Sequence, residues 1–275
     1  MRIPVTTLND GYDFPLLGLG TYKLTGDEVE PIVRTAIELG YRHIDTAALY
    51  GNEVEVGKAI NAAIKAGDVT REELFVTTKL WNDDQERVAE AYHESLERLD
   101  LEFIDLYLVH WPWPQHGTYV KAFEQIAELQ GMGRLQSAGV ANFYPEVLDE
   151  IIAATGITPV LNQVELHAGF TQPELRAYHD EHDIVTEAWA PLARGGNFDD
   201  PAIQAVADKH GATPAQVSLA YLMQLGCSVV PKTANPKRLE ENLGAVGITL
   251  DSEDVAALDG VAGGRLSGDP LTFPG

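Results

Sequence analysis

The sequence YRHIDTAALYGNE, residues 41–53, contains a short apolar strand that stops at Asp45 and presents Tyr50 just beyond it. Two further strand-like runs, LFVTTK and FIDLYLVH, end in Lys79 and His110. Parallel strands of a barrel end at the same mouth, so strands of this kind would bring the four side chains together. We therefore predict that these four residues belong to one site.

Strand-like and helix-like segments alternate over the rest of the chain. Most of the strand-like runs are apolar on both faces, which is typical of a parallel sheet covered by helices. A hairpin-like segment precedes the alternation, with Asn9-Asp10-Gly11 as its turn. We expect that hairpin over residues 5–16, strands near residues 17–21, 42–45, 74–79, 103–110, 135–141, 160–165, 184–190 and 227–232, and helices near residues 27–39, 53–66, 84–99, 118–130, 145–153, 172–182, 201–224 with an interruption at Gly211, and 236–245.

This pattern predicts an α/β protein, a closed (β/α)8 TIM barrel with an N-terminal β-hairpin, as a single domain over residues 1–275. The rival is an open doubly wound sheet, in which function gathers at one switch point rather than at many strand ends. The rival also lacks its phosphate loop, because Lys23 stands where the third glycine after Gly18 and Gly20 should be. In a barrel, one mouth would collect the polar residues that follow successive strands, which are Asp45, Lys79, His110, Asn142, Gln163, Trp189 and Lys232.

The charge balance is strongly acidic. Of 275 residues, 42 are acidic and 19 are basic, which gives a formal net charge of −23. Nucleic acid is therefore not expected as a partner. Such self-repulsion is best tolerated where concentrated salt shortens the Debye length to about 3 Å. Because the acidic residues are spread along the whole chain, we interpret them as salt adaptation, with an ordinary acidic cytosolic protein as the alternative.

The sequence does not indicate a reactive cysteine, a membrane segment or a metal site. The single cysteine, Cys227, lies in an apolar run and is interpreted as a buried, inert thiol. The sequence shows no signal peptide and no run of about 18 apolar residues, so we expect a cytoplasmic protein that contacts no membrane. No zinc-type spacing of cysteine and histidine occurs, and we interpret His179 and His182 as a solvated surface pair. We therefore expect no metal.

The four residues of the site have complementary chemistry. A tyrosine hydroxyl has a pKa of about 10, and a nearby ammonium group lowers it by stabilising the phenolate. Lys79 can do this for Tyr50, and Asp45 can keep the lysine charged and in place. His110 can hydrogen-bond the same substrate oxygen. The set predicts a general acid that protonates an oxygen while another group attacks the attached carbon.

Each of the four residues also has an ordinary structural explanation. Asp45 would cap the next turn, Tyr50 would pack with its hydroxyl in water, Lys79 would be a solvated strand end, and His110 would be a core histidine with its hydrogen bonds satisfied. The functional interpretation is favoured by the combination, because four matched groups occur at three neighbouring strand ends.

Short motifs follow one another in order along nearly the whole chain. They are GLGTY (18–22), YRHIDTA (41–47) with YGNE (50–53), LYLVHWP (106–112), GVANF (139–143), NQVE (162–165), APLARG (190–195), and VPKT (230–233) with Arg238, Glu241 and Asn242. The series strongly resembles the aldo-keto reductase family, in particular bacterial and archaeal members similar to 2,5-diketo-gluconate reductases.

The resemblance implies reduction of an aldehyde or ketone to an alcohol with a nicotinamide cofactor on the same barrel fold. Tyr50 would donate the proton, supported by the other three residues. The cofactor would lie across the barrel mouth. Its implied partners are Gly20 and Thr21; Asn142 and Gln163 at the carboxamide; Trp189, in place of a more usual tyrosine, stacked on the nicotinamide; Leu192, Arg194 and Gly195 over the pyrophosphate; and Lys232, Thr233, Arg238, Glu241 and Asn242 at the adenosine end.

Lys232 and Arg238 indicate which nicotinamide cofactor is used. Two cations and the Thr233 hydroxyl suit the adenosine 2′-phosphate, and they have no matching task against a free ribose hydroxyl. The sequence therefore predicts NADPH rather than NADH. The alternative is that both cations belong to a solvated helix start together with Lys237.

The substrate pocket is expected to be aromatic. Tyr22, Trp81 and Trp111 are predicted to line it above the nicotinamide, with Leu49 and Trp113 as further candidates. The family resemblance implies a small carbonyl substrate and a monomeric protein. Two other functions remain as alternatives: a cofactor-binding redox sensor with little turnover, which would not need Tyr50, and a barrel isomerase or aldolase without nicotinamide.

Overall fold

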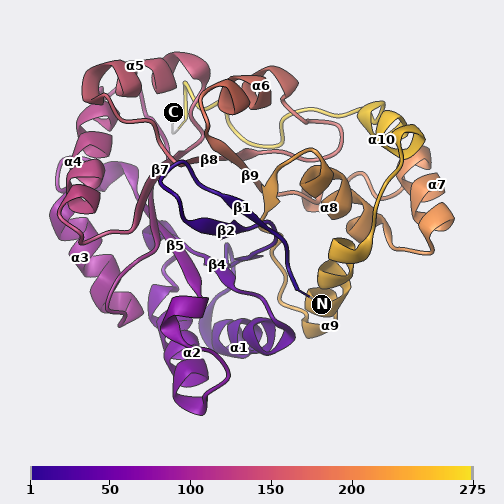
Figure 1. Ribbon diagram of the computed structural model, residues 1–275, viewed down its shortest axis with the longest axis horizontal. Helices are drawn as coiled ribbons and strands as arrows, with labels where there is room; N and C mark the ends of the chain where they lie inside the picture. Colours follow the sequence, from indigo (N-terminus) through magenta and orange to yellow (C-terminus); the bar gives the residue numbers. More distant parts are fainter. Residues whose placement is uncertain (1, 274–275) are drawn as a thin grey trace.

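The computed structural model, which describes residues 2–273, has the predicted closed barrel (Figure 1). Eight parallel strands pair in chain order. The sheet closes between its first and last strands, where Gly20 N donates to Pro231 O at 3.2 Å. An added Cβ at Gly20 would lie 2.7 Å from Val230 O, so the closing seam requires glycine. The barrel strands are β3 Leu19–Gly20, β4 His43–Asp45, β5 Phe75–Leu80, β6 Leu106–Val109, β7 Ser137–Ala141, β8 Leu161–Glu165, β9 Val185–Trp189 and β10 Ser228–Val229.

Helices surround the sheet on its outside (Figure 1). Helix α1 shows why the helices cover the sheet, because its buried residues recur every three or four positions and form one apolar face. The helix is terminated by Gly40, whose φ of 102° is left-handed. The predicted 201–224 helix is two helices on either side of Gly211. The helices are α1 Val29–Leu39, α2 Glu53–Ala66, α3 Val88–Leu99, α4 Tyr119–Gly131, α5 Pro145–Thr155, α6 Pro173–Glu181, α7 Pro201–His210, α8 Pro214–Gln224, α9 Pro236–Leu243 and α10 Ser252–Asp259.

Helix α10 was not among the predicted helices. Asp251 caps it, because the Asp251 carboxylate accepts hydrogen bonds from Glu253 N at 2.9 Å and Asp254 N at 3.0 Å. Lys209 of α7 bridges to Asp251 at 2.6 Å and to Asp254 at 2.7 Å, so the start of α10 is tied to α7. Within residues 2–273, no helix combines the length and the apolar character that crossing a bilayer requires.

The N-terminal hairpin closes one end of the barrel. Strand β1, Val5–Thr7, pairs antiparallel with β2, Asp13–Pro15, and the hairpin crosses the middle of the view in Figure 1. Phe14 is fully buried, with its ring centre 4.9 Å from that of Phe75 at the start of β5. Asn9 Nδ2 donates to Pro159 O, just before β8. These contacts are at the amino-terminal ends of the strands, so the carboxyl ends remain open for a site.

The interpretation of His179 as a surface residue was wrong. His179 is not a solvated surface residue; it belongs to α6 and is fully buried. Its Nδ1 lies 2.8 Å from Thr186 Oγ1 and its Nε2 lies 2.9 Å from Asn162 Nδ2, so the ring joins α6 to β8 and β9. Burial lowers the pKa of His179 to about 3, and the ring is therefore neutral. His182 is half-buried and stacks on Tyr178 with ring centres 4.0 Å apart.

Candidate active site

A cavity of 570 Å³ opens at the carboxyl ends of the barrel strands. Its walls are largely apolar and aromatic, and its floor carries polar side chains, a composition typical of small-molecule sites. The residues that were singled out from the sequence and that line this cavity are Gly20, Tyr22, Asp45, Leu49, Tyr50, Trp81, His110, Trp111, Asn142, Gln163, Trp189, Leu192, Arg194 and Lys232.

Other predicted residues of the described chain lie outside the cavity lining. Lys79 is fully buried behind Asp45, and Arg238 is exposed at the start of α9. Trp113 turns away and stacks on His116, with ring centres 3.5 Å apart, so it was wrongly considered as a wall of the pocket. The remaining residues outside the lining are Thr21, Gly195, Thr233, Glu241 and Asn242.

The C-terminal segment supplies part of the cavity that the sequence did not reveal. Phe273 lies against Trp111 with ring centres 4.2 Å apart. Glu165 at the end of β8 holds this segment, because its carboxylate accepts a hydrogen bond from Ser267 Oγ at 2.6 Å and another from Leu266 N. The sequence signal that was available for this wall was Phe273, an isolated aromatic residue near the end of the chain. The lining residues that the sequence did not reveal are Lys23, Ser267, Gly268 and Phe273, whereas Ala190, Pro191, Val230 and Pro231 belong to the family motifs quoted above and were not assigned a role individually.

A buried ion pair lies at the floor of the cavity. Lys79 Nζ donates to Asp45 Oδ2 at 2.7 Å and to Thr46 O at 2.8 Å, and the lysine side chain is fully buried. Burial alone would lower the pKa of Lys79, but the charge of Asp45 and the hydrogen bond to its carboxylate raise it above its usual value. The lysine is therefore an ammonium ion in a position fixed by two acceptors.

Tyr50 lies next to this ammonium group. It ends the short helical turn Ala48–Tyr50, which Gly51 terminates with a left-handed φ of 66°. Lys79 Nζ is 5.2 Å from the centre of the Tyr50 ring. Burial raises the pKa of Tyr50 to about 12, while Lys79 acts in the opposite direction. The expected acidification by Lys79 is thus present but smaller than the effect of burial, so Tyr50 keeps its proton at neutral pH.

His110 completes the polar floor. Its ring centre is 5.8 Å from that of Tyr50 and 5.3 Å from that of Trp81. Burial and the neighbouring Lys79 hold the pKa of His110 well below its usual range, so the imidazole is neutral. Its Nδ1 is buried without a hydrogen-bond partner among residues 2–273. A neutral ring that carries its proton on Nε2 can donate to an oxygen in the cavity.

Two side-chain amides lie beside the floor, and both are fixed by hydrogen bonds. Asn142 Nδ2 donates to His110 O, and Asn142 Oδ1 accepts from Trp189 Nε1, each at 2.9 Å. Gln163 Nε2 donates to Asp45 Oδ2 at 2.8 Å and to Glu187 Oε2 at 2.6 Å. The N–H of the Trp189 indole therefore orients Asn142. A tyrosine ring at this position has no N–H with which to make the same hydrogen bond.

The cavity has exposed cationic side chains in its lining. Arg194 and Lys232 line it and are exposed, and Arg238 lies nearby in sequence at the start of α9. None of the three forms an ion pair within the described part of the chain. In a protein with a net charge of −23, cations without acidic partners indicate a site for an anionic group.

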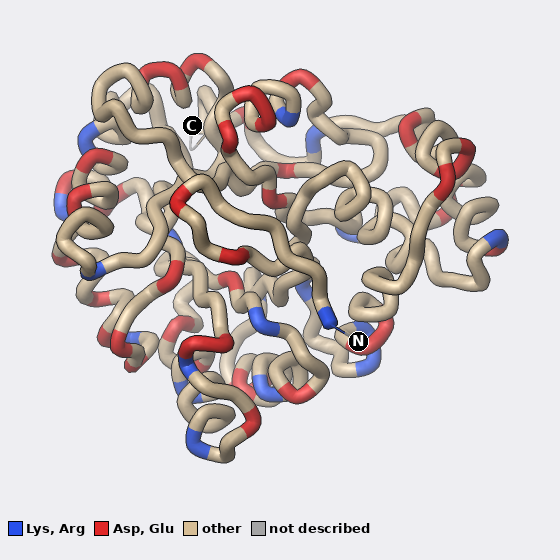
Figure 2. The backbone as a smooth tube through the Cα atoms, viewed as in Figure 1, with Lys and Arg blue, Asp and Glu red and all other residues tan. Residues whose placement is uncertain are grey.

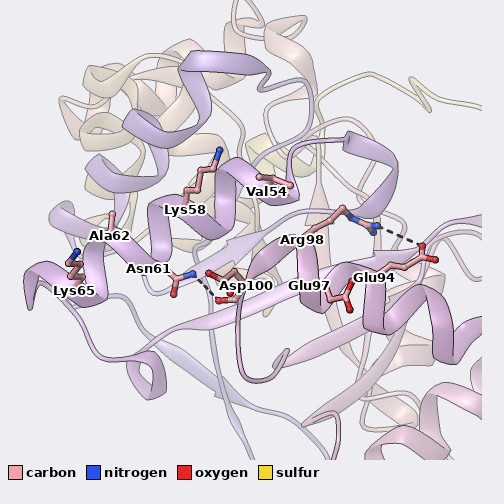
Figure 3. A pocket seen from close by; sticks show the side chains of 9 residues that line it. All are labelled: Val54, Lys58, Asn61, Ala62, Lys65, Glu94, Glu97, Arg98 and Asp100. Atoms are coloured by element: carbon pink, nitrogen blue, oxygen red, sulfur yellow. Dashed lines mark hydrogen bonds and ion pairs between the residues drawn. The ribbon is translucent and has the colours of Figure 1, made fainter.

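A second cavity, of 690 Å³, lies on the outer helices and differs in kind (Figure 3). It lies between α2 and α3, away from the strand ends, and has no aromatic wall. Its side chains pair locally: Arg98 lies 3.8 Å from Glu94, and Asn61 donates to Asp100 O at 2.8 Å. It is therefore a surface groove between two helices, and it lacks the aromatic wall and the strand-end residues of the cavity at the barrel mouth.

The barrel collects the polar floor and the aromatic wall at one mouth, and the chain belongs to the aldo/keto reductase family. The sequence profile of that family matches residues 16–262. The chain is 46% identical to the methylglyoxal reductase DkgA of Escherichia coli over 276 residues, and 44% identical to an aldo-keto reductase of Mycolicibacterium smegmatis over 273 residues. Both alignments cover 98% of each chain.

Solved structures agree with this assignment. A point mutant of Gox0644 in complex with NADPH is 43% identical to the chain, and the match covers 98% of both chains with a TM-score of 0.93. The agreement extends over nearly the full length, so the barrel and its hairpin are shared.

Proposed function

We propose that the protein is an NADPH-dependent reductase that converts small aldehydes and ketones, methylglyoxal in particular, to alcohols. The observation that supports this most strongly is the cavity floor, where a protonated Tyr50 lies beside the buried Lys79–Asp45 pair and a neutral His110. The reaction class follows from the family. The preference for methylglyoxal is supported by the similarity to DkgA.

The residues of the floor divide the chemistry among them. NADPH, when bound, supplies the hydride. Tyr50 gives its proton to the carbonyl oxygen, and His110 Nε2 donates a hydrogen bond that holds this oxygen. The Lys79 ammonium stabilises the phenolate left on Tyr50. Asp45 keeps Lys79 charged and in place, so its role is positional rather than a contact with the substrate.

The residues at the mouth fit the parts of NADPH. Asn142 and Gln163 present amide groups suited to the nicotinamide carboxamide, and the Trp189 ring suits the nicotinamide face. The cations Arg194 and Lys232 of the cavity lining suit the phosphates. For the other predicted cofactor-binding residues, we propose the roles that the family resemblance implies. These residues are Gly20, Thr21, Leu192, Arg194, Gly195, Lys232, Thr233, Arg238, Glu241 and Asn242.

Replacing Lys232 or Arg238 by alanine is expected to raise the KM for NADPH about 10- to 100-fold, because each removes a charge-assisted hydrogen bond to the 2′-phosphate. The KM for NADH, which lacks that phosphate, should stay unchanged. Steady-state kinetics with both cofactors measures this. Lys237→Ala is the matched control, because Lys237 is the neighbour of Arg238 on α9, and it should alter neither KM. A wild-type preference for NADH would contradict the assignment.

The aromatic wall supports a small, flat substrate. Trp111 is mostly buried and is covered by Phe273, whereas Tyr22 is half exposed at the mouth. We expect purified protein to oxidise NADPH with methylglyoxal and other small aldehydes, and to do so more slowly with bulky sugars. The test is the rate of NADPH oxidation across a panel of aldehydes, keto acids and sugars. Activity confined to bulky sugars would contradict the proposed substrate class.

We also propose salt adaptation. Acidic residues occur on helices all around the barrel (Figure 2), which suits a surface-wide role rather than a local binding site. Raising potassium chloride from dilute buffer to about 1 M should increase activity and the denaturant concentration needed for unfolding, because salt screens like charges. Full stability in dilute buffer would contradict salt adaptation.

Further proposals concern the form and place of the enzyme. We propose that residues 1–275 act as one domain, as a monomer, in the cytoplasm. The family match across residues 16–262 supports the single domain, and the dependence on NADPH suits the cytoplasm.

A further inference from the structure

Glu187 is a buried carboxyl group without a part in the chemistry described above. It lies on β9, two residues before Trp189, and is fully buried inside the barrel. Its Oε2 accepts a hydrogen bond from Gln163 Nε2 at 2.6 Å. Its other oxygen, Oε1, lies 3.3 Å from Ser228 Oγ and 3.5 Å from His43 Nδ1. Glu187 is thus directly connected to one of the two amides at the cavity floor.

The surroundings of Glu187 favour its neutral form. Burial and the nearby charge of Asp45 raise the pKa of Glu187 to about 8. Burial and the Lys79 charge lower the pKa of His43 to about 3, and His43 Nε2 lies 3.1 Å from Thr77 Oγ1. His43 Nδ1 is buried and otherwise lacks a donor among the described residues. A proton on Glu187 Oε1 would point to this nitrogen, while Oε2 would remain an acceptor for Gln163.

A metal ion is the other explanation for this cluster. His43, Asp45 and Glu187 each offer a possible ligand atom, and these atoms lie within 4.8 Å of one another. The Lys79 ammonium and the Gln163 amide already donate to the same carboxylate oxygens. A cation would therefore meet positive donors at close range, so the cluster is better described as a hydrogen-bonded network.

The network fixes which end of the Gln163 amide faces the cavity. An amide nitrogen has two hydrogens, and here they go to Asp45 Oδ2 and Glu187 Oε2. Gln163 Oε1 is then left to offer an acceptor. Asn142 is fixed in the opposite sense: its Oδ1 accepts from Trp189, and its Nδ2 keeps a second hydrogen to donate. One acceptor and one donor match a ligand carboxamide, which has an N–H donor and a carbonyl acceptor.

We propose that Glu187 is a positioning residue for cofactor binding: it holds Gln163 in the orientation in which Gln163 Oε1 accepts from the carboxamide N–H of the nicotinamide. This inference rests on the proposed use of NADPH. Without Glu187, only Asp45 holds the amide nitrogen, and the amide can turn its N–H groups toward those of the ligand. A neutral side chain with an acceptor and a donor at position 187 would preserve the arrangement.

Two ligands separate this role from a general structural one. NADP⁺ carries the carboxamide, whereas its 3-acetylpyridine analogue keeps the carbonyl and lacks the N–H. In the Glu187→Leu variant, the Kd for NADP⁺ should rise about tenfold, the effect of one lost hydrogen bond, while the Kd for the analogue should change less than about twofold. Tryptophan fluorescence titration with both ligands measures this, and circular dichroism checks the fold.

Two further variants serve as controls. Glu187→Gln keeps a neutral acceptor and donor and should retain most of the affinity for NADP⁺. Ser228→Ala removes a hydrogen bond to the other Glu187 oxygen and should leave both affinities unchanged. If Glu187→Leu does not fold, Glu187→Asp withdraws the acceptor by one methylene group, and the same selective loss is expected.

The outcomes are distinct. An equal rise in the Kd for NADP⁺ and for the analogue would overturn the inference. Such a result would indicate damage to the whole cofactor site, which affects a ligand with or without the carboxamide N–H. Unchanged binding of NADP⁺ in the Leu and Asp variants would overturn it as well. If the wild-type protein itself neither bound NADP⁺ nor oxidised NADPH, the proposed function would fail together with the inference, and the wild-type titration shows this before any variant is made.

Discussion

Replacing Tyr50 by phenylalanine is expected to lower kcat for carbonyl reduction about 10²- to 10⁴-fold, the usual contribution of a positioned general acid. Phenylalanine keeps the ring and its packing against His110 but removes the proton. The affinity for NADPH should stay unchanged, because the groups assigned to the cofactor are untouched. Single-turnover rates and a fluorescence titration of NADPH measure the two effects separately.

Tyr22→Phe is the matched control for this change. Its ring lies 5.1 Å from that of Tyr50 in the same cavity, so it receives the same chemical change without loss of the proposed donor. It should shift the KM for the substrate and leave kcat close to that of the wild type. Retained turnover in Tyr50→Phe would disprove the donor. Binding of NADPH with no reduction by the wild-type protein would instead favour the redox-sensor alternative.

The raised pKa of Tyr50, about 12, also sets the direction of the pH dependence. Reduction needs the protonated phenol, so Tyr50 should cause no loss of rate between neutral and mildly alkaline pH. Oxidation of the alcohol needs the phenolate, which becomes more populated as the pH rises, so the reverse rate should increase over the same range.

Replacing Lys79 by methionine is expected to lower the free energy of unfolding by about 3 to 5 kcal/mol. Methionine fills a similar volume, but it leaves the buried Asp45 carboxylate without its partner. Reduction should also be largely lost, because the phenolate formed on Tyr50 would no longer be stabilised. Urea unfolding followed by circular dichroism measures the stability.

The control for Lys79→Met is the double variant with Asp45→Asn. It removes both charges, so the uncompensated carboxylate disappears and much of the lost stability should return. Activity should not return, because the ammonium group is still absent. A Lys79→Met protein as stable as the wild type would contradict the interpretation of the pair as a buried, mutually dependent ion pair.

The barrel could be predicted because its signals are local. Strands that are apolar on both faces and helices with one apolar face repeat along the chain, and these patterns do not depend on distant contacts. Helix α10 was missed although Asp251 and Asp254 carry the sequence signature of a helix start. His179 was wrongly taken as exposed, because a polar residue on a short polar helix gives no sign that its ring reaches two strands.

The features of the site also divide into those that local sequence patterns predict and those that depend on the folded structure. Asp45, Tyr50, Lys79 and His110 could be predicted because each lies at or beyond the carboxyl end of a strand, and the barrel brings those ends together. The effect of burial on the pKa of Tyr50 could not be found, since burial depends on the whole mouth of the barrel. The C-terminal wall was missed for a related reason: its position depends on non-local hydrogen bonds to Glu165 rather than on its own sequence.

Glu187 shows a further limit of sequence patterns. It lies in the middle of β9, where residues 186–188 are all buried, but the sequence does not distinguish a buried position filled by an apolar side chain from one that holds a buried carboxyl group. Only the contacts with Gln163, Ser228 and His43 reveal that this position is connected to the cavity floor.

The most direct test of carbonyl reduction at the barrel mouth is the consumption of NADPH by purified protein in the presence of methylglyoxal, at low and high salt, with product analysis. We expect one NADPH to be oxidised for each carbonyl reduced, and this turnover to disappear in the Tyr50→Phe protein. Binding of NADPH without turnover of methylglyoxal or any other small aldehyde, or equal turnover by the Tyr50→Phe protein, would contradict it.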